Sequence, residues 1–143
     1  PVSRLDSLII AMGTAGDKRA LKPLLAKLNQ LEKHFQFSHI RAVALALERL
    51  GDPEGAAPLA ALLSKKGISG HHRITIKGTY LTKDHKGSTR DSRSRAAALL
   101  ELILARALYR CGDHKGIAKN ILSLYSKDLR GHFARHAHAV LGE

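Results

Sequence analysis

The histidines and the one cysteine of this chain are the side chains best suited to hold a metal ion. His132 and His136 are four residues apart, a spacing that puts two side chains on one face of a helix, and His138 follows them. Cys111 and His114 form a second small group. Zinc needs three or four converging ligands, and the sequence contains no HExxH motif and no paired CxxC motif. The histidines therefore indicate a polar helix face, and we expect neither a metal site nor a cofactor.

Residues for catalysis are also sparse. Cys111 stands one residue before a Gly-Asp pair, as Leu50 does before another, which predicts a small buried side chain rather than a reactive thiolate. Asp17, Asp52 and Asp113 each follow a glycine, the position that caps a following helix. The other carboxylates are scattered, and no acidic pair stands out for acid–base work. We expect that this chain alone is not an enzyme.

Basic side chains gather in one part of the chain. Residues 65–95 contain nine Lys and Arg and two Asp, a net charge of +7 out of the formal +12 of the whole sequence. Such a concentration attracts anionic partners, which include nucleic acid, anionic lipid and acidic proteins. The other interpretation is a solvated loop that is basic without binding anything. The candidate partner-binding residues are Lys65, Lys66, His71, His72, Arg73, Lys77, Lys83, Lys86 and Arg90.

The same stretch interrupts a helical sequence pattern, and we call residues 64–91 the basic insertion. Residues 73–82 alternate polar and apolar side chains around Lys77 and Gly78, which predicts a short β-hairpin. A lone hairpin is marginal in water, so it must pack on the helices, bind a partner or stay mobile. Replacing Gly67 to Ser88 with a short linker is expected to leave the helical core folded.

An internal repeat supplies the elements that position these residues. The sequence Ala46–Asp52 recurs as Ala107–Asp113, more loosely as Ala11–Asp17, and weakly at residues 137–143. The glycines of these copies are spaced by 35, 61 and 30 residues, and the middle step contains roughly 26 extra residues, which are the basic insertion. Each glycine ends one helix and each following Asp caps the next, with Pro53 at a first helical position.

Apolar residues recur at helical spacing on both sides of each glycine. Repeat three differs only where Asn120 interrupts the apolar stripe, and its first helix is unusually long, from about Ser92 to Cys111. Leu and Ala dominate the 44% hydrophobic residues and Trp is absent, as expected for closely packed helices. The predicted core includes Leu24, Leu25, Val43, Leu47, Leu59, Leu63, Leu108 and Ile121.

These residues resemble the HEAT-like repeats of the lyase-associated type, in which an Arg-containing helix runs into a Leu-Gly-Asp turn. Arg41–Leu63 resembles that pattern best, followed by Arg106–Leu124, and repeats one and four depart from it. The resemblance implies an all-α fold, an α-solenoid of antiparallel helix hairpins with a basic loop or hairpin insertion. We expect one domain over residues 1–143, with the insertion at 64–91.

A narrower resemblance concerns three strings: Ser38–Ala42, Glu101–Leu108 and Leu129–Arg135. They are similar to the helical C-terminal region of certain large bacterial FAD-dependent oxidoreductases. This resemblance implies that the chain is a piece of a longer protein whose flavin chemistry lies elsewhere. No strand followed by a Gly-x-Gly-x-x-Gly turn is present to bind a dinucleotide here.

Three functions follow from these observations. The first is a protein-interaction or scaffolding module that binds a protein partner or the rest of a parent chain, since solenoids offer extended surfaces. The second is nucleic-acid binding through phosphate contacts, which the charge permits although base-stacking aromatic residues are few. The third, a lyase-like role on a bilin chromophore, is implied by the repeat type alone. No apolar run approaches the roughly 18 residues of a membrane span.

Overall fold

The computed structural model describes residues 3–31, 37–75 and 89–142, with the backbone alone for residues 89–92. Over these residues the chain forms α-helices and two short 3-10 helices and no strand, so the all-α prediction is confirmed. None of the described helices is long and apolar enough to cross a bilayer. The elements are α1 (Arg4–Thr14), η1 (Lys18–Ala20), α2 (Leu21–Leu31), α3 (Phe37–Leu50), η2 (Pro53–Gly55), α4 (Ala56–Leu63), α5 (Thr89–Arg110), α6 (Ile117–Tyr125) and α7 (Gly131–Leu141).

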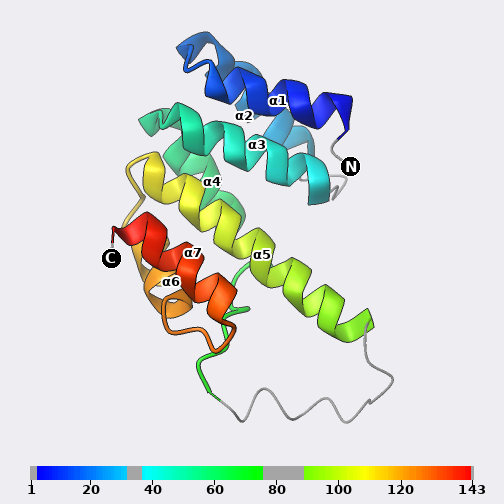
Figure 1. Ribbon diagram of the computed structural model, residues 1–143. Helices are drawn as coiled ribbons and strands as arrows, with labels where there is room; N and C mark the ends of the chain where they lie inside the picture. The colour runs from blue at the N-terminus through cyan, green and yellow to red at the C-terminus, as the bar shows by residue number, and fades with distance from the viewer. Residues whose placement is uncertain (1–2, 32–36, 76–88, 143) are drawn as a thin grey trace.

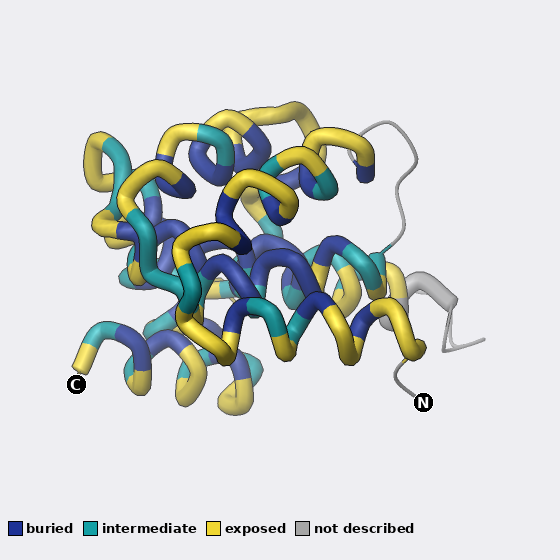
Figure 2. The backbone as a smooth tube through the Cα atoms, turned by 90° about the horizontal axis from the view of Figure 1, so that it is seen from above, coloured by how far each residue is buried: buried dark blue, intermediate teal, exposed yellow. Residues whose placement is uncertain are grey.

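The helices lie in two layers. Helices α1, α3, α5 and α7 follow one another in the front layer of Figure 1, and α2, α4 and α6 lie behind them. In the front layer α1 packs on α3, α3 on α5 and α5 on α7. In the second layer α2 packs on α3, α4 on α5, and α6 on both α5 and α7. Buried residues concentrate on the sides of the helices that face the rest of the fold, as the dark segments of Figure 2 show.

The Gly-Asp turns form at the first two predicted places with one geometry. Gly16 and Gly51 have φ of 69° and 60°, the left-handed conformation that glycine adopts without a steric cost. The following Asp17 and Asp52 accept backbone hydrogen bonds from the residues two positions on, at 2.9 and 3.0 Å. Pro53 begins η2, where its missing N–H leaves no hydrogen bond unmade. Each hairpin is therefore closed by the predicted mechanism.

The third turn, after α5, is longer than predicted. Asp113 caps α6 by accepting hydrogen bonds from the backbone N–H groups of Ala118 and Lys119, at 2.9 and 3.1 Å. The turn ends at Gly116, which also has a positive φ. This added length shifts the buried stripe of α6 by one residue relative to the alignment, so Asn120 is exposed and interrupts nothing. The buried residues of α6 are Ala118, Ile121, Leu122 and Tyr125.

The predicted core is buried at seven of its eight positions. The exception is Leu25, which is only half-buried because α2 is open on one side. In α1 the apolar side chains of Leu5 and Leu8 are also exposed, by 41% and 60%. Helix α1 packs mainly on α3, so one narrow face, with Ile9 at its centre, is enough to cover that contact.

Gly13 sets the distance between α1 and α3. A Cβ atom built at this glycine would lie 2.4 Å from both the Cα and the carbonyl oxygen of Ala46. Real side chains do not approach a backbone so closely, so only glycine allows the two helices to pack at this separation. Glycine is otherwise unfavourable inside a helix, and this close approach to Ala46 gives the reason for Gly13 within α1.

Candidate partner-binding surface

The predicted binding residues fall into three groups. Lys65 and Lys66 are exposed after α4, whereas His71, His72 and Arg73 are half-buried in an extended segment. Lys77, Lys83 and Lys86 lie outside the described residues, as does the side chain of Arg90. Most of the predicted hairpin lies outside them too, and residues 73–75 form no strand. Partner binding by this set stays a prediction.

The start of the basic insertion packs against the helices, and we call residues 68–73 the anchored segment. Its backbone binds Glu101 of α5, a carboxylate that is only 1% exposed. The N–H groups of Gly70 and His71 donate to Glu101 Oε1 and Oε2 at 2.9 and 2.8 Å. The Tyr125 hydroxyl donates to Oε2 at 2.8 Å, and burial together with the neighbouring Glu101 charge raises the pKa of Tyr125. Glu101 therefore joins the insertion, α5 and α6.

A second buried carboxylate holds the end of the anchored segment. Asp128 Oδ2 accepts from the Arg73 N–H at 2.8 Å, and the Leu129 N–H donates to the Arg73 carbonyl at the same distance. Burial would raise the pKa of Asp128, but hydrogen bonds from Arg130 and the Arg73 backbone hold it below its usual value. The Arg130 guanidinium also donates to the carbonyl of His71 at 2.8 Å. Residues 68–73 therefore pack against the helices although α4 ends at Leu63, and the bounds of the insertion stay a prediction.

The sequence contained a signal for Glu101 that the search for acidic pairs missed. Glu101 lies inside the run Leu99–Leu104, in which the remaining five residues are all apolar. A carboxylate in the middle of such a run must either face solvent or receive several hydrogen bonds. The partners come from residues 70, 71 and 125, which no local spacing connects to residue 101.

Of the histidines considered as metal ligands, His136 has a different partner. Arg106 donates from Nη1 to His136 Nδ1 at 2.7 Å and from Nη2 to Glu48 Oε1 at 3.1 Å. Burial, followed by the charges of Arg106, His132 and Arg135, lowers the pKa of His136. This guanidinium links α3, α5 and α7. Among the described residues, no three His, Cys, Asp or Glu side chains are placed to hold a metal ion.

Cys111 is buried, as predicted, and only 2% exposed. Its Sγ lies 3.6 Å from the carbonyl oxygen of Leu47. The same atom lies close to Gly55, where an added Cβ would be 3.1 Å from it. Burial, with smaller contributions from the charges of Asp52 and Glu48, raises its pKa to about 11. The thiol is therefore protonated and enclosed, which is unsuitable for nucleophilic attack.

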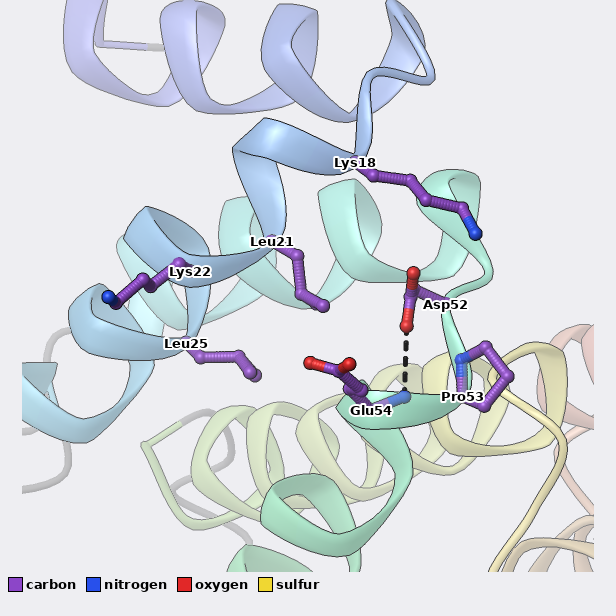
Figure 3. Close-up of a pocket in the computed structure, with 7 residues that line it drawn as sticks. All are labelled: Lys18, Leu21, Lys22, Leu25, Asp52, Pro53 and Glu54. Atoms are coloured by element: carbon purple, nitrogen blue, oxygen red, sulfur yellow. Dashed lines mark hydrogen bonds between the residues drawn. The ribbon is translucent and has the colours of Figure 1, made fainter.

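A concave surface lies between α2 and the segment that begins α4. One hollow of about 670 Å³ is lined by the side chains drawn in Figure 3, which are Lys18, Leu21, Lys22, Leu25, Asp52, Pro53 and Glu54. A second hollow of about 540 Å³ shares Lys22 and Leu25 with it and continues to Asn29, Pro58 and Ala61. We call the two together the α2–α4 groove. The sequence did not predict this groove; Lys18 lies in η1 and Lys22 near the start of α2, and both are exposed.

Comparison with known proteins identifies one repeat. Residues 41–65 match the family model of the PBS lyase HEAT-like repeat. The match covers α3, the Gly51-Asp52 turn and α4, where the sequence resemblance was strongest, and it supports a HEAT-like helical repeat. No curated protein and no solved structure matches the chain. The resemblance to FAD-dependent oxidoreductases has no support from these comparisons.

Proposed function

We propose that this chain is a protein-interaction module, an α-solenoid of HEAT-like helix hairpins that binds a segment of another protein or of a longer parent chain. The α2–α4 groove carries the proposal. It is an open surface between successive helix hairpins, in which the half-buried Leu25 lies beside the exposed Lys22 and Glu54. Repeat proteins commonly present such surfaces to partners.

The buried polar groups support binding rather than chemistry. Asp6 pairs with His39, and its backbone N–H donates to the Ser3 hydroxyl that caps α1. Glu101 and Asp128 hold the anchored segment. Each of these carboxylates already has a structural role inside the fold. That the chain alone carries no catalytic role is part of this proposal.

The experiment is a selection from a random peptide library displayed on phage, washed at low salt and again at about 0.5 M, where the Debye length falls to roughly 4 Å. An interaction module should enrich a recognisable class of peptides that survives the second wash, because apolar contacts are not screened by salt. An unrelated helical protein of similar net charge is the control. Enrichment no greater than that of the control would contradict the proposal.

Nucleic-acid binding through phosphate contacts is the second candidate. The observation in its favour is the formal charge of +12, of which +7 lies between residues 65 and 95. The described Phe and Tyr side chains are buried or half-buried, so none is available to stack freely on bases. Binding to duplex DNA should therefore be independent of sequence and weaken steeply with salt. Binding of duplex DNA that does not depend on sequence and weakens steeply up to about 0.2 M salt (roughly physiological strength), without any peptide enrichment, would favour this candidate over the first.

A further inference from the structure

The α2–α4 groove exists because the two layers pack differently. In the front layer Gly13 lets α1 approach α3 at backbone distance. In the second layer α2 and α4 each pack on a front helix but make at most isolated contacts with each other. Close packing on one side and separation on the other leave an open channel along α2. The channel is thus a consequence of the helix arrangement and not of one side-chain conformation.

The side chains of the groove have two kinds of chemistry. Leu21 and Leu25 project from α2 toward Glu54 across the hollow (Figure 3). Leu25 is half-buried, so an apolar surface remains for a ligand to cover. Lys18 and Lys22 come from η1 and α2, and Asp52 and Glu54 come from the turn into α4. In Figure 3 the Lys18 side chain extends toward Asp52, whereas the Lys22 side chain points away from both carboxylates. The groove therefore presents the half-buried Leu25 between Lys22 and the carboxylate of Glu54.

We propose that the α2–α4 groove binds an extended peptide segment of a partner protein, with an apolar side chain on Leu25, an acidic side chain beside Lys22 and a basic one beside Glu54. This inference rests on the proposed interaction function and names the partner's chemistry. Helix α2 has 11 residues. At about 1.5 Å per helical residue and about 3.3 Å per extended residue, its length accommodates roughly five residues of the partner.

The charges favour a peptide over a nucleic acid at this place. A phosphate backbone carries one sign of charge along its whole length, so it would meet repulsion from Asp52 and Glu54. A peptide can present both signs within a few residues and apolar side chains between them. Charge complementarity on two sides also fixes the direction in which the peptide lies.

The probe is a fluorescein-labelled peptide with the sequence Asp-Leu-Ala-Leu-Arg between glycine ends, and the control peptide has the same composition in another order. Binding is measured by fluorescence anisotropy to the whole chain. Lys22→Glu should weaken binding of the probe about tenfold or more, because it places like charges side by side. The matched variant Lys119→Glu alters an equally exposed lysine on α6, outside the groove, and should change the affinity less than about twofold.

Two further measurements separate the groove from general electrostatics. A probe with Lys in place of Asp should recover affinity for Lys22→Glu while losing it for the wild type. Ala61→Trp, which fills the second hollow from the α4 side, should block the probe, whereas Ala139→Trp on the exposed face of α7 should not. Circular dichroism of all four variants checks that the helices remain.

Several outcomes would overturn the inference. These are equal weakening by Lys22→Glu and Lys119→Glu, no preference for the probe over the reordered peptide, or a wild-type dimer in sedimentation that Lys22→Glu dissociates. In the last case a second copy of the chain occupies the groove. If library peptides bind Lys22→Glu and Ala61→Trp as tightly as the wild type, the groove is not their binding site, but the proposed interaction function is retained. A library that yields no peptides removes both.

Discussion

Glu101 is the residue at which three separate parts of the chain meet. Its two carboxylate oxygens accept hydrogen bonds from Gly70, His71 and Tyr125, all inside the fold. Removing a carboxylate from water costs several kcal/mol in proteins, and hydrogen bonds to both of its oxygens are needed to offset this cost. Glu101 meets that condition, and so it fixes the position of the anchored segment rather than weakening the core.

Glu101→Gln should lower the free energy of unfolding by about 1–3 kcal/mol, the cost of one buried donor left without an acceptor. The amide keeps one acceptor oxygen, but its NH2 group faces a backbone N–H that now has no partner. Urea denaturation measures the loss. Glu54→Gln, at an exposed position, is the control and should stay within about 0.5 kcal/mol of the wild type. Equal effects of the two changes would show that Glu101 is not a buried anchor.

Cys111 gives the fold a dependence on alkaline pH. Its pKa is raised from 9.0 to about 11, mainly by burial, so the folded state favours the neutral thiol. The resulting stability is complete below pH 9.0 and is lost as the pH rises toward 11, because only the unfolded chain ionises the thiol in that range. The free energy of unfolding of the wild type, relative to Cys111→Ala, should fall by about 2 kcal/mol across this window. Denaturant titrations at several pH values give the difference, and a constant difference would mean that the thiol is accessible to water when folded.

At the scale of elements, the spacing between α1 and α3 depends on Gly13. Alanine normally favours a helix over glycine by about 1 kcal/mol, so a gain is expected where space allows. At Gly13 the added Cβ would meet the backbone of Ala46 at 2.4 Å, and one helix must move. The steric cost of overpacking, typically about 1–3 kcal/mol, exceeds the gain in helix propensity.

Gly13→Ala should therefore destabilise the chain, while Gly131→Ala should not. Gly131 lies at the start of α7 with no atom within 4 Å of an added Cβ, so it isolates the effect of helix propensity. Thermal unfolding followed by circular dichroism compares the two. A stabilised Gly13→Ala would show that α1 is free to move away from α3 at no cost.

The basic insertion contains an element boundary that the sequence pattern did not reveal. Ile68 is buried. The backbone N–H groups of Gly70 and His71 donate to Glu101, and that of Arg73 donates to Asp128. Replacing residues 76–88 with a short Gly-Ser linker should change stability by less than about 1 kcal/mol, because the entropy of closing a loop varies slowly with its length. Replacing residues 67–88, as the sequence first suggested, should cost at least about 3 kcal/mol more, since Glu101 and Asp128 lose donors. Equal stability of the two deletions, measured in urea, would contradict the role of the anchored segment.

For the molecule as a whole, local patterns predicted the helices and the Gly-Asp turns because their causes lie within a few residues. Gly51, Asp52 and Pro53 end one helix and begin the next by themselves. Glu101 and the α2–α4 groove could not be predicted in this way, since each depends on segments distant in sequence. The one-residue shift in α6 has a local cause, the longer turn that ends at Gly116. Since the chain contains several other glycines, the presence of Gly116 alone does not predict a longer turn.

The distribution of charge over the whole molecule decides between the two candidate functions. Each lysine that contacts a DNA phosphate makes the slope of log K against log salt concentration more negative by about 0.9. If the basic insertion makes those contacts, replacing Lys77, Lys83 and Lys86 by alanine should make the slope less negative by up to about 2.7. Replacing Lys115, Lys119 and Lys127, three exposed lysines around α6, removes the same charge and should leave the slope nearly unchanged. Anisotropy of labelled duplex DNA over a salt series measures both, and equal reductions would show that DNA responds to the net charge of +12 and not to a dedicated site.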